Sequence, residues 1–187
     1  MRRGFKAEAE EYAKEFRHEL GIEEHMPLCP WKLAEHLCIP IMTLSAFGNM
    51  LPEEVLHLKN KGQDAFSAVT VLSGRKRLVI HNDFHHPKRQ SNNIAHELAH
   101  GILCHPASPI LNGTASSRKY DKEIEDEANW LGATLLVPKE ATWFIVSNRM
   151  SITEASDLYN VSHELLNWRI RMTGANVRYA RKSRKTA

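Results

Sequence analysis

The residues most able to do chemistry in this sequence form one pentapeptide, His96-Glu97-Leu98-Ala99-His100. Histidines at positions i and i+4 of a helix lie on one face, one turn apart, so both rings can bind the same zinc ion. The glutamate after the first histidine projects beside that metal, where its carboxylate can take a proton from water. The pentapeptide alone is a weak signal, because the same pattern recurs by chance in ordinary helices.

The helix expected around the pentapeptide, from a Ser91 cap to about His105, strengthens the metal interpretation. At 100° per residue its apolar side chains occupy one broad arc, and His96, Glu97 and His100 fill the remaining sector. The helix is therefore expected to be largely buried. Two histidines and a carboxylate are costly to bury without partners, and a metal ion supplies the partner.

A catalytic zinc site needs a third protein ligand and an open fourth position. His105 does not fit, because it points about 140° away from His100 if the helix continues. On a wheel of the next long helix, Glu125 lies within the apolar arc, whereas Glu123 and Glu127 lie on the opposite side and are expected to be solvated. A carboxylate on an apolar face must be neutralised or bound. Glu125 is therefore predicted as the third ligand, with an inward salt bridge as the alternative.

Five further residues near these ligands or in a histidine cluster have simpler interpretations. Asn129, one turn after Glu125, is predicted to brace a ligand from outside the coordination sphere. Cys104 is expected to be a small core residue. The remaining histidine cluster is expected to mark a strand end and a turn rather than a second metal site: His81, His85 and His86.

The rest of the sequence predicts an α+β fold, with a small central sheet or hairpin flanked by helices. Two β-prone runs, 66–72 and 77–82, are separated by Ser73-Gly74-Arg75-Lys76 and indicate a hairpin. A short strand should follow Pro40. Helical spacing, proline starts and glycine stops predict helices at 5–20, at 30–38, from 52, at 121–137 and two or three times after 138, with a loop at 107–119.

Three parts of the chain are expected. A peptidase-like domain covers 1–148, a helix-turn-helix-like element packed on it covers 149–175, and a basic flexible tail covers 176–187. The helix-turn-helix interpretation needs polar residues exposed on the second helix, and three could serve: His163, Asn167 and Arg171. The alternative is that this helix simply packs onto the body through its apolar residues.

Composition places the chain among ordinary globular proteins, with 42% apolar and 25% charged residues. The charged N-terminus has no apolar signal region, and no apolar run approaches the roughly 18 residues of a membrane span. The three cysteines are an odd number without metal-knuckle spacing, which favours free thiols in a reducing compartment. We therefore expect a cytoplasmic protein without a membrane partner.

Charge is unevenly distributed along the chain. Residues 169–187 hold seven Lys or Arg and no acid, which leaves 18 basic against 22 acidic residues elsewhere. A basic tail on an acidic body can contact DNA weakly and without sequence preference, or bind an acidic partner. The alternative is a frayed end that only aids solubility.

These motifs together resemble the ImmA/IrrE family of gluzincin-type metallopeptidases. The resemblance rests on HELAH at 96–100 followed by EDEANWLGATLLVP at 125–138, and on the segments 30–41, 77–82 and 90–105. It implies one zinc ion, a compact α+β fold and cleavage of one protein partner, commonly a helix-turn-helix repressor. Trp130-Leu131-Gly132 departs from the small-aromatic-Ala run usual in the family, which affects local packing rather than the ligand.

Two functions follow from different classes of protein. In the first, a zinc endopeptidase, Glu97 takes the proton of the attacking water and passes it to the leaving amine. Its oxyanion donor is left open among Tyr120, Tyr159 and His163, and strand 77–82 could pair with an extended substrate. The alternative is a DNA-binding or repressor-sequestering module with a non-catalytic metal site. The presence of Glu97 argues against it, because a structural site does not need that carboxylate.

Overall fold

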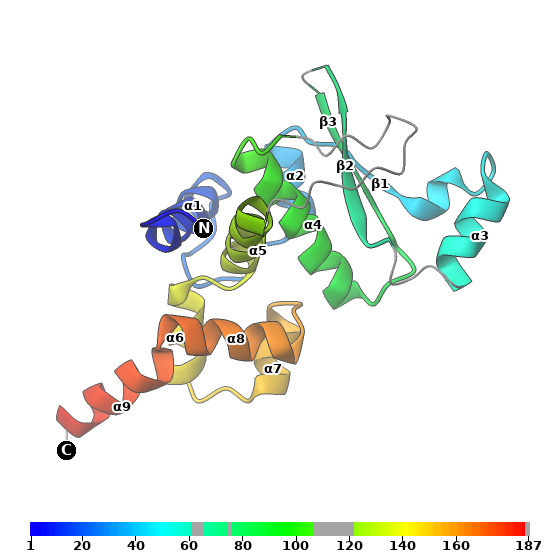
Figure 1. The fold of residues 1–187 in the computed structure, drawn as a ribbon. Helices are drawn as coiled ribbons and strands as arrows, with labels where there is room; N and C mark the ends of the chain where they lie inside the picture. The colour runs from blue at the N-terminus through cyan, green and yellow to red at the C-terminus, as the bar shows by residue number, and fades with distance from the viewer. Residues whose placement is uncertain (61–65, 75, 107–121, 186–187) are drawn as a thin grey trace.

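This α+β protein combines helices with a small sheet that lies at one side of the molecule, next to α2 and α4 (Figure 1). The computed structural model describes residues 1–60, 66–74, 76–106 and 122–185, so the loop expected at 107–119 lies outside the described residues. Its elements follow in chain order: α1 (Phe5–Glu19), α2 (Pro30–His36), β1 (Ile41–Thr43), a 3-10 turn (Leu44–Phe47), α3 (Pro52–Asn60), β2 (Ala68–Ser73), β3 (Lys76–His81), α4 (Pro87–Ile102), α5 (Lys122–Leu136), α6 (Lys139–Ser147), α7 (Ile152–Leu158), α8 (His163–Thr173) and α9 (Ala175–Lys185).

The three described strands form a mixed sheet in the order β1-β3-β2. β2 and β3 pair antiparallel from Ala68 with His81 to Ser73 with Lys76, which confirms the predicted hairpin. β1 runs parallel to β3, in a register that begins with Ile41 opposite Val79. β3 therefore has its hydrogen-bonding groups engaged on both sides, and β2 lies at one edge of the described sheet.

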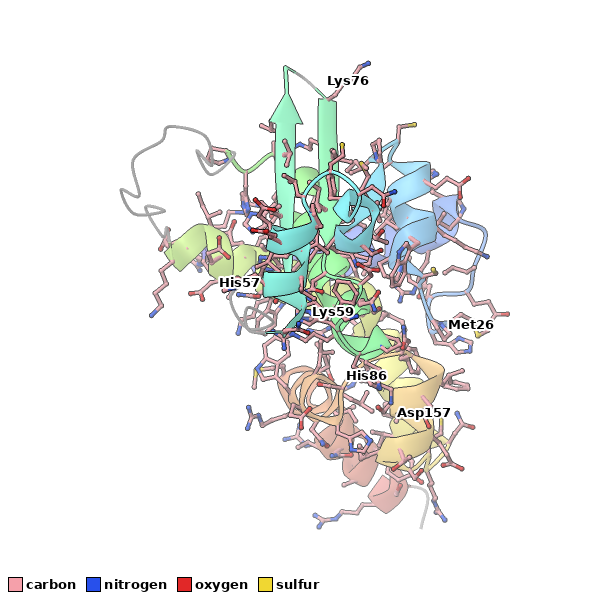
Figure 2. All side chains as sticks on the ribbon, turned by 90° about the vertical axis from the view of Figure 1, so that its right-hand side faces the viewer. Met26, His57, Lys59, Lys76, His86 and Asp157 are labelled. Carbon is pink, nitrogen blue, oxygen red and sulfur yellow. The ribbon has the colours of Figure 1, made fainter. Side chains whose placement is uncertain are left out.

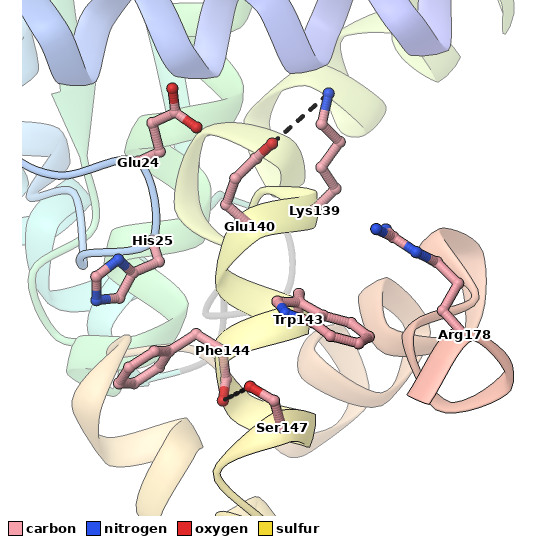
Figure 3. Close-up of a pocket in the computed structure, with 8 residues that line it drawn as sticks. All are labelled: Glu24, His25, Lys139, Glu140, Trp143, Phe144, Ser147 and Arg178. Atoms are coloured by element: carbon pink, nitrogen blue, oxygen red, sulfur yellow. Dashed lines mark hydrogen bonds and ion pairs between the residues drawn. The ribbon is translucent and has the colours of Figure 1, made fainter. Parts of the chain in front are cut away.

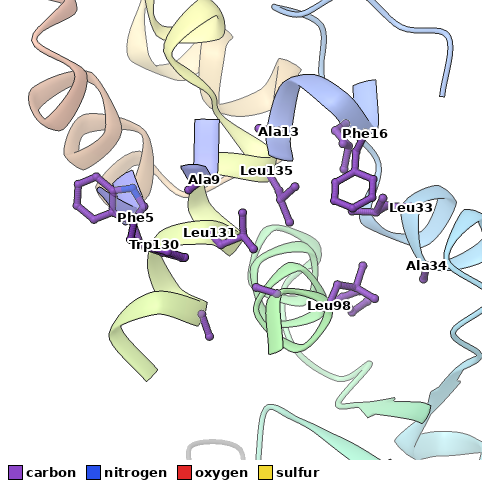
Figure 4. Packing of buried hydrophobic residues seen from close by; sticks show 14 residues of the cluster. Phe5, Ala9, Ala13, Phe16, Leu33, Ala34, Leu98, Trp130, Leu131 and Leu135 are labelled. Atoms are coloured by element: carbon purple, nitrogen blue, oxygen red, sulfur yellow. The ribbon is translucent and has the colours of Figure 1, made fainter. Parts of the chain in front are cut away.

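Three helices form the main core. α1, α4 and α5 meet through small and branched side chains, among them Ala9 and Ala13 of α1, Leu98 of α4, and Leu131 and Leu135 of α5 (Figure 4). All five of these residues are completely buried. Burying a leucine contributes roughly 1.5–3 kcal/mol, so this packing fixes α4 against α5 firmly enough to place the polar residues on their remaining faces.

Both ends of α4 differ from the prediction. The helix begins at Pro87, where His86 caps it by accepting a hydrogen bond from the Lys88 backbone N–H at 3.2 Å. The predicted cap, Ser91, is instead buried within the helix. A proline at the first helical position needs no backbone hydrogen bond there, which explains the earlier start. At the other end α4 stops at Ile102 rather than at about His105.

The C-terminal helices pack around a second apolar cluster that includes Leu136, Ile145 and Leu166. Lys88, in the first turn of α4, joins this part to the sheet side through Asp157 (2.6 Å) and the Ser156 hydroxyl (2.7 Å). Figure 2 labels His86 and Asp157, which mark the two sides of that junction.

α7 and α8 are two helices joined by a short turn in which Asn160 has a positive φ of 49°. Leu166 and Ile170 of α8 are buried, while the polar residues proposed for DNA contact lie on its exposed face: His163, Asn167 and Arg171. The boundaries at 148 and 175 stay a prediction.

Residues 176–185 of the expected basic tail belong to the helix α9, and the flexibility expected of this tail stays a prediction. α9 extends away from the body at the C-terminal end (Figure 1). Its first turns are held against α6, where Trp143 and Tyr179 have ring centroids 6.3 Å apart and the Arg178 guanidinium lies 5.2 Å from the Trp143 ring. Such contacts order a segment whose charges alone would favour a solvated coil.

No helix in the described ranges is long and apolar enough to cross a membrane. The three cysteines are free thiols and are all exposed. The prediction that Cys104 is a core residue is therefore wrong. It lies beyond the end of α4, where the chain has already left the helix face that enters the core.

Candidate metal centre

The three residues predicted as metal ligands lie together. His96 and His100 project from α4, and Glu125 projects from the first turn of α5. The two Nε2 atoms are 3.1 Å apart, His96 Nε2 is 3.4 Å from Glu125 Oε2, and His100 Nε2 is 3.7 Å from Glu125 Oε1. Within the described residues these three are the one His, Cys, Asp or Glu group close enough to hold a metal ion.

The spacing of these atoms fits a tetrahedral ion. Ligand atoms at about 2.0–2.1 Å from a tetrahedral zinc are separated from one another by about 3.3 Å, and the observed separations of 3.1, 3.4 and 3.7 Å bracket that value. Two imidazole nitrogens and one carboxylate are also the donor set of many catalytic zinc sites, which leave the fourth position open. The residues present therefore fit zinc by donor chemistry and by distance.

The electrostatics of His100 suit metal binding. Burial, together with the neighbouring His96 and His105, lowers the pKa of His100 to about 3. The ring is therefore neutral near pH 7 and keeps a lone pair for a metal, as a ligand must. Glu125 lies within salt-bridge distance of both rings, with 28% of its side chain exposed, so one side of the site remains open.

Glu97 points toward the sheet. Its Oε2 accepts a hydrogen bond of 2.6 Å from the Thr70 hydroxyl on β2. Burial raises the pKa of the Glu97 carboxyl, while the Thr70 hydrogen bond and His96 act in the opposite direction and Glu125 adds to the rise. A carboxylate with a raised pKa beside a metal site is a better proton acceptor at neutral pH than a solvated one. Thr70 could not be recognised from the sequence, because its contact with Glu97 depends on how β2 packs on α4.

His105 occupies a place that the helical wheel excluded. Cys104 has a positive φ of 52°, and the His105 N–H donates to the His100 carbonyl at 3.0 Å, a left-handed helix ending. The chain therefore turns back, and His105 Nδ1 lies 3.0 Å from His100 Nδ1. The wheel assumed that α4 continued past Ile102, and it does not.

Glu127 is a second correction. It was expected to be solvated, yet only 8% of it is exposed. Its Oε1 accepts a hydrogen bond of 2.9 Å from the Arg2 backbone N–H, and its Oε2 lies 3.8 Å from His105 Nε2. The face of α5 opposite the apolar arc is covered by the N-terminal segment, which a helical wheel cannot reveal. Glu123, with 80% of its side chain exposed, does face solvent as predicted.

Several other predicted site residues have no contact among the described residues that assigns them a role at the metal site. Asn129 is exposed on α5, and its role beside a ligand stays a prediction. Among the three candidate oxyanion donors, Tyr120 lies outside the described residues and His163 is exposed at the start of α8. Tyr159 is engaged elsewhere, because its buried hydroxyl donates to the His25 carbonyl at 2.6 Å.

A separate pocket of about 410 Å³ lies away from the metal ligands, between residues 24–25, α6 and Arg178 of α9 (Figure 3). Some of its polar groups interact with one another: Lys139 with Glu140 at 3.6 Å, and the Ser147 hydroxyl with the Phe144 carbonyl at 3.2 Å. We therefore place the chemistry at the convergent ligands and not at this hollow. The donor set, rather than the size of a cavity, marks the site.

A family model for the IrrE N-terminal-like domain, a peptidase family, matches residues 34–171. The chain belongs to this family. The match covers α4 and α5, the two helices that carry the convergent histidines and glutamate. No curated protein matches the chain. Family membership makes the chain a peptidase of a metal-dependent kind and confirms the resemblance seen in the sequence.

Proposed function

We propose that this chain is a zinc-dependent endopeptidase that cleaves a specific protein in the cytoplasm. The observation that carries the proposal is the convergence of His96 Nε2, His100 Nε2 and the Glu125 carboxylate at separations of 3.1–3.7 Å. Membership in a peptidase family supports the reaction class. The zinc identity rests on the donor set, two imidazoles and a carboxylate with room for a fourth ligand.

Each residue has a separate task in this mechanism. His96, His100 and Glu125 would hold the metal, and a zinc ion bound there would supply a Lewis acid that lowers the pKa of water to about 7 and polarises a carbonyl. Glu97 accepts the proton of the attacking water and gives it to the leaving amine. The Thr70 hydroxyl holds Glu97 Oε2, which leaves the other carboxylate oxygen free for the proton.

The substrate strand is assigned to a different place from the one the sequence suggested. β3 has neighbours on both sides, so it cannot pair with a peptide. β2 lies at an edge of the described sheet, and Thr70 on it contacts Glu97. We propose that an extended peptide adds to the β2 edge, where main-chain hydrogen bonds would bring its scissile bond to the carboxylate.

The proposed protein substrate is a DNA-bound helix-turn-helix repressor, and the support comes from the family resemblance and from charge. α9 carries basic residues and no acid, while the rest of the chain has an excess of acids. Arg181 and Arg184 are exposed on this projecting helix. Contacts of such residues with phosphates would be weak, sensitive to salt and independent of sequence.

The alternative, a DNA-binding or repressor-sequestering module with a non-catalytic metal site, is less well supported. A structural metal site needs no buried carboxylate beside its ligands. Here the Glu97 carboxyl lies next to His96, His100 and Glu125, and burial there disfavours its charged form, which raises its pKa. Proton transfer during peptide cleavage requires such a carboxylate, whereas sequestration of a repressor does not.

The test compares two conservative variants of neighbouring carboxylates. Glu97→Gln should keep zinc at one equivalent by mass spectrometry and abolish cleavage of a helix-turn-helix repressor offered as substrate, since an amide cannot accept the proton. Glu125→Gln, the matched control, should lose both zinc and cleavage. Cleavage by the Glu97→Gln protein would remove the proposed base, and full zinc content in the Glu125→Gln protein would remove the proposed third ligand.

A further inference from the structure

A line of three polar side chains extends behind the candidate metal site. His100 Nδ1, on the side of the ring away from the other ligands, lies 3.0 Å from His105 Nδ1. His105 Nε2 in turn faces Glu127 Oε2 at 3.8 Å. His105 and Glu127 are each only 8% exposed. The protons of these two buried groups and of the half-buried His100 must be compatible, because a mismatched donor or acceptor in a buried position would be costly.

The proton positions in this line follow from its two ends. The negative charge of Glu127 favours a proton on the nearer nitrogen of His105, Nε2, which leaves Nδ1 of that ring as an acceptor. His105 Nδ1 can then accept a hydrogen bond from an N–H at His100 Nδ1. That assignment leaves the lone pair of His100 on Nε2, the atom 3.1 Å from His96 Nε2 and 3.7 Å from Glu125.

We infer that His105 and Glu127 are positioning residues that fix the tautomer and the ring orientation of His100 for metal binding. The inference rests on the proposed zinc function and adds two residues to it. A metal-binding histidine commonly donates its second ring N–H to a carboxylate or a carbonyl, and loss of that partner weakens metal binding about 10- to 100-fold. Here a second histidine stands between the ligand and the carboxylate.

Contacts from other segments hold the two members of the line beyond His100, namely His105 and Glu127. The Arg2 backbone N–H donates to Glu127 Oε1 at 2.9 Å, and the Arg77 guanidinium donates to the His105 carbonyl at 3.4 Å. These contacts come from the N-terminal segment and from β3, so the position of His105 does not depend on α4 alone. The other histidine ligand has no such support, since His96 Nδ1 is buried without a hydrogen-bond partner in the described part of the chain.

The experiment measures zinc affinity by competition with a chelator in the full-length chain. Glu127→Gln keeps the size of the side chain and an oxygen for the Arg2 N–H but removes the charge. His105→Phe keeps a ring of similar shape but removes the acceptor. Both should weaken zinc binding about 10-fold or more. Glu123→Gln, the matched control one turn earlier on α5 with an exposed side chain, should bind zinc as the wild type does.

A spectroscopic measurement separates positioning from space filling. In the zinc-loaded wild type, NMR should show a slowly exchanging proton on His100 Nδ1, and His105→Phe should make that proton exchange rapidly. If His105 only filled space, the phenylalanine variant would keep both its zinc affinity and this proton. Unchanged zinc affinity in both variants would overturn the inference alone. A wild-type chain that binds no zinc would overturn the proposed function as well.

Discussion

Gly132 is where α5 comes closest to the backbone of α4, and replacing it with alanine should disturb the metal site from outside. A Cβ added at Gly132 would lie 3.1 Å from His96 Cα, 3.1 Å from His96 N and 3.2 Å from Ala95 C. Carbon atoms pack best at about 3.5–4.0 Å, so the helices must separate by about 0.4 Å or more. Because those neighbours are backbone atoms, no side-chain rotation relieves the contact.

The change in the free energy of unfolding caused by Gly132→Ala is the balance of two opposing contributions. Overpacking a core costs about 1–3 kcal/mol, while alanine is favoured over glycine within a helix by about 0.8–1 kcal/mol. The free energy of unfolding of the zinc-free chain should therefore fall by about 0–2 kcal/mol. Each 1 kcal/mol corresponds to about 2–4 °C in Tm for a chain of this size.

Zinc affinity should respond more than stability does. Ligand distances in a working metal site hold to about 0.2 Å, and a movement of about 0.4 Å between α4 and α5 separates His96 from Glu125 by more than that. We therefore expect zinc to bind more weakly to the Gly132→Ala protein. Chelator competition measures this affinity, and urea unfolding of the zinc-free chain measures the stability.

Gly101→Ala is the matched control, because it adds the same methyl group to α4 without a backbone clash. Its Cβ would meet only side-chain atoms, Ile39 Cδ1 at 3.4 Å and Arg77 Cδ at 3.7 Å. This variant should be neutral or slightly more stable, so the difference between the two variants isolates the cost of the clash. Equal stability and equal zinc affinity in the two proteins would refute the reasoning.

Two further predictions concern the C-terminal half. Burial raises the pKa of the Tyr159 phenol to about 12. The unfolded chain therefore loses this proton at a lower pH, and the free energy of unfolding should fall as the pH rises from about 10 to 12. In urea titrations at alkaline pH, Tyr159→Phe should reduce that fall, whereas the control Tyr179→Phe should not. Replacing Arg181 and Arg184 together with glutamine should reduce the cleavage rate of DNA-bound repressor at low salt and leave the rate for free repressor unchanged. Equal rates on DNA-bound repressor for this double variant and the wild type would leave α9 without a role in DNA contact.

Local pattern was enough for the elements that position the ligands. The i, i+4 histidine pair and the apolar arc of α4 depend only on helical geometry, which repeats every 3.6 residues whatever the surroundings. The same geometry singled out Glu125 among three nearby glutamates, and the structure brings it within 3.4 Å of His96. The β2–β3 hairpin followed from a short turn between two β-prone runs, which is also a local signal.

Helix ends were less predictable, because they depend on competition between neighbouring signals. Ser91 and His86 both could cap a helix, and Pro87 decided in favour of the earlier start. At the other end, Cys104 adopts a left-handed conformation that is unusual for a residue with a side chain. That single backbone turn brought His105 back to His100, which a continuous wheel could not foresee.

The sequence by itself indicated the peptidase family, which the family match confirms, and it was enough to propose the ligand set, since residue types and helical spacing can be read from the sequence alone. Only the tertiary structure decided what surrounds them. Thr70 reaches Glu97 from 27 positions away, and Arg2 reaches Glu127 from 125 positions away. Such contacts arise from the packing of β2 and the N-terminal segment against α4 and α5, and packing between distant segments leaves no periodic trace in the sequence.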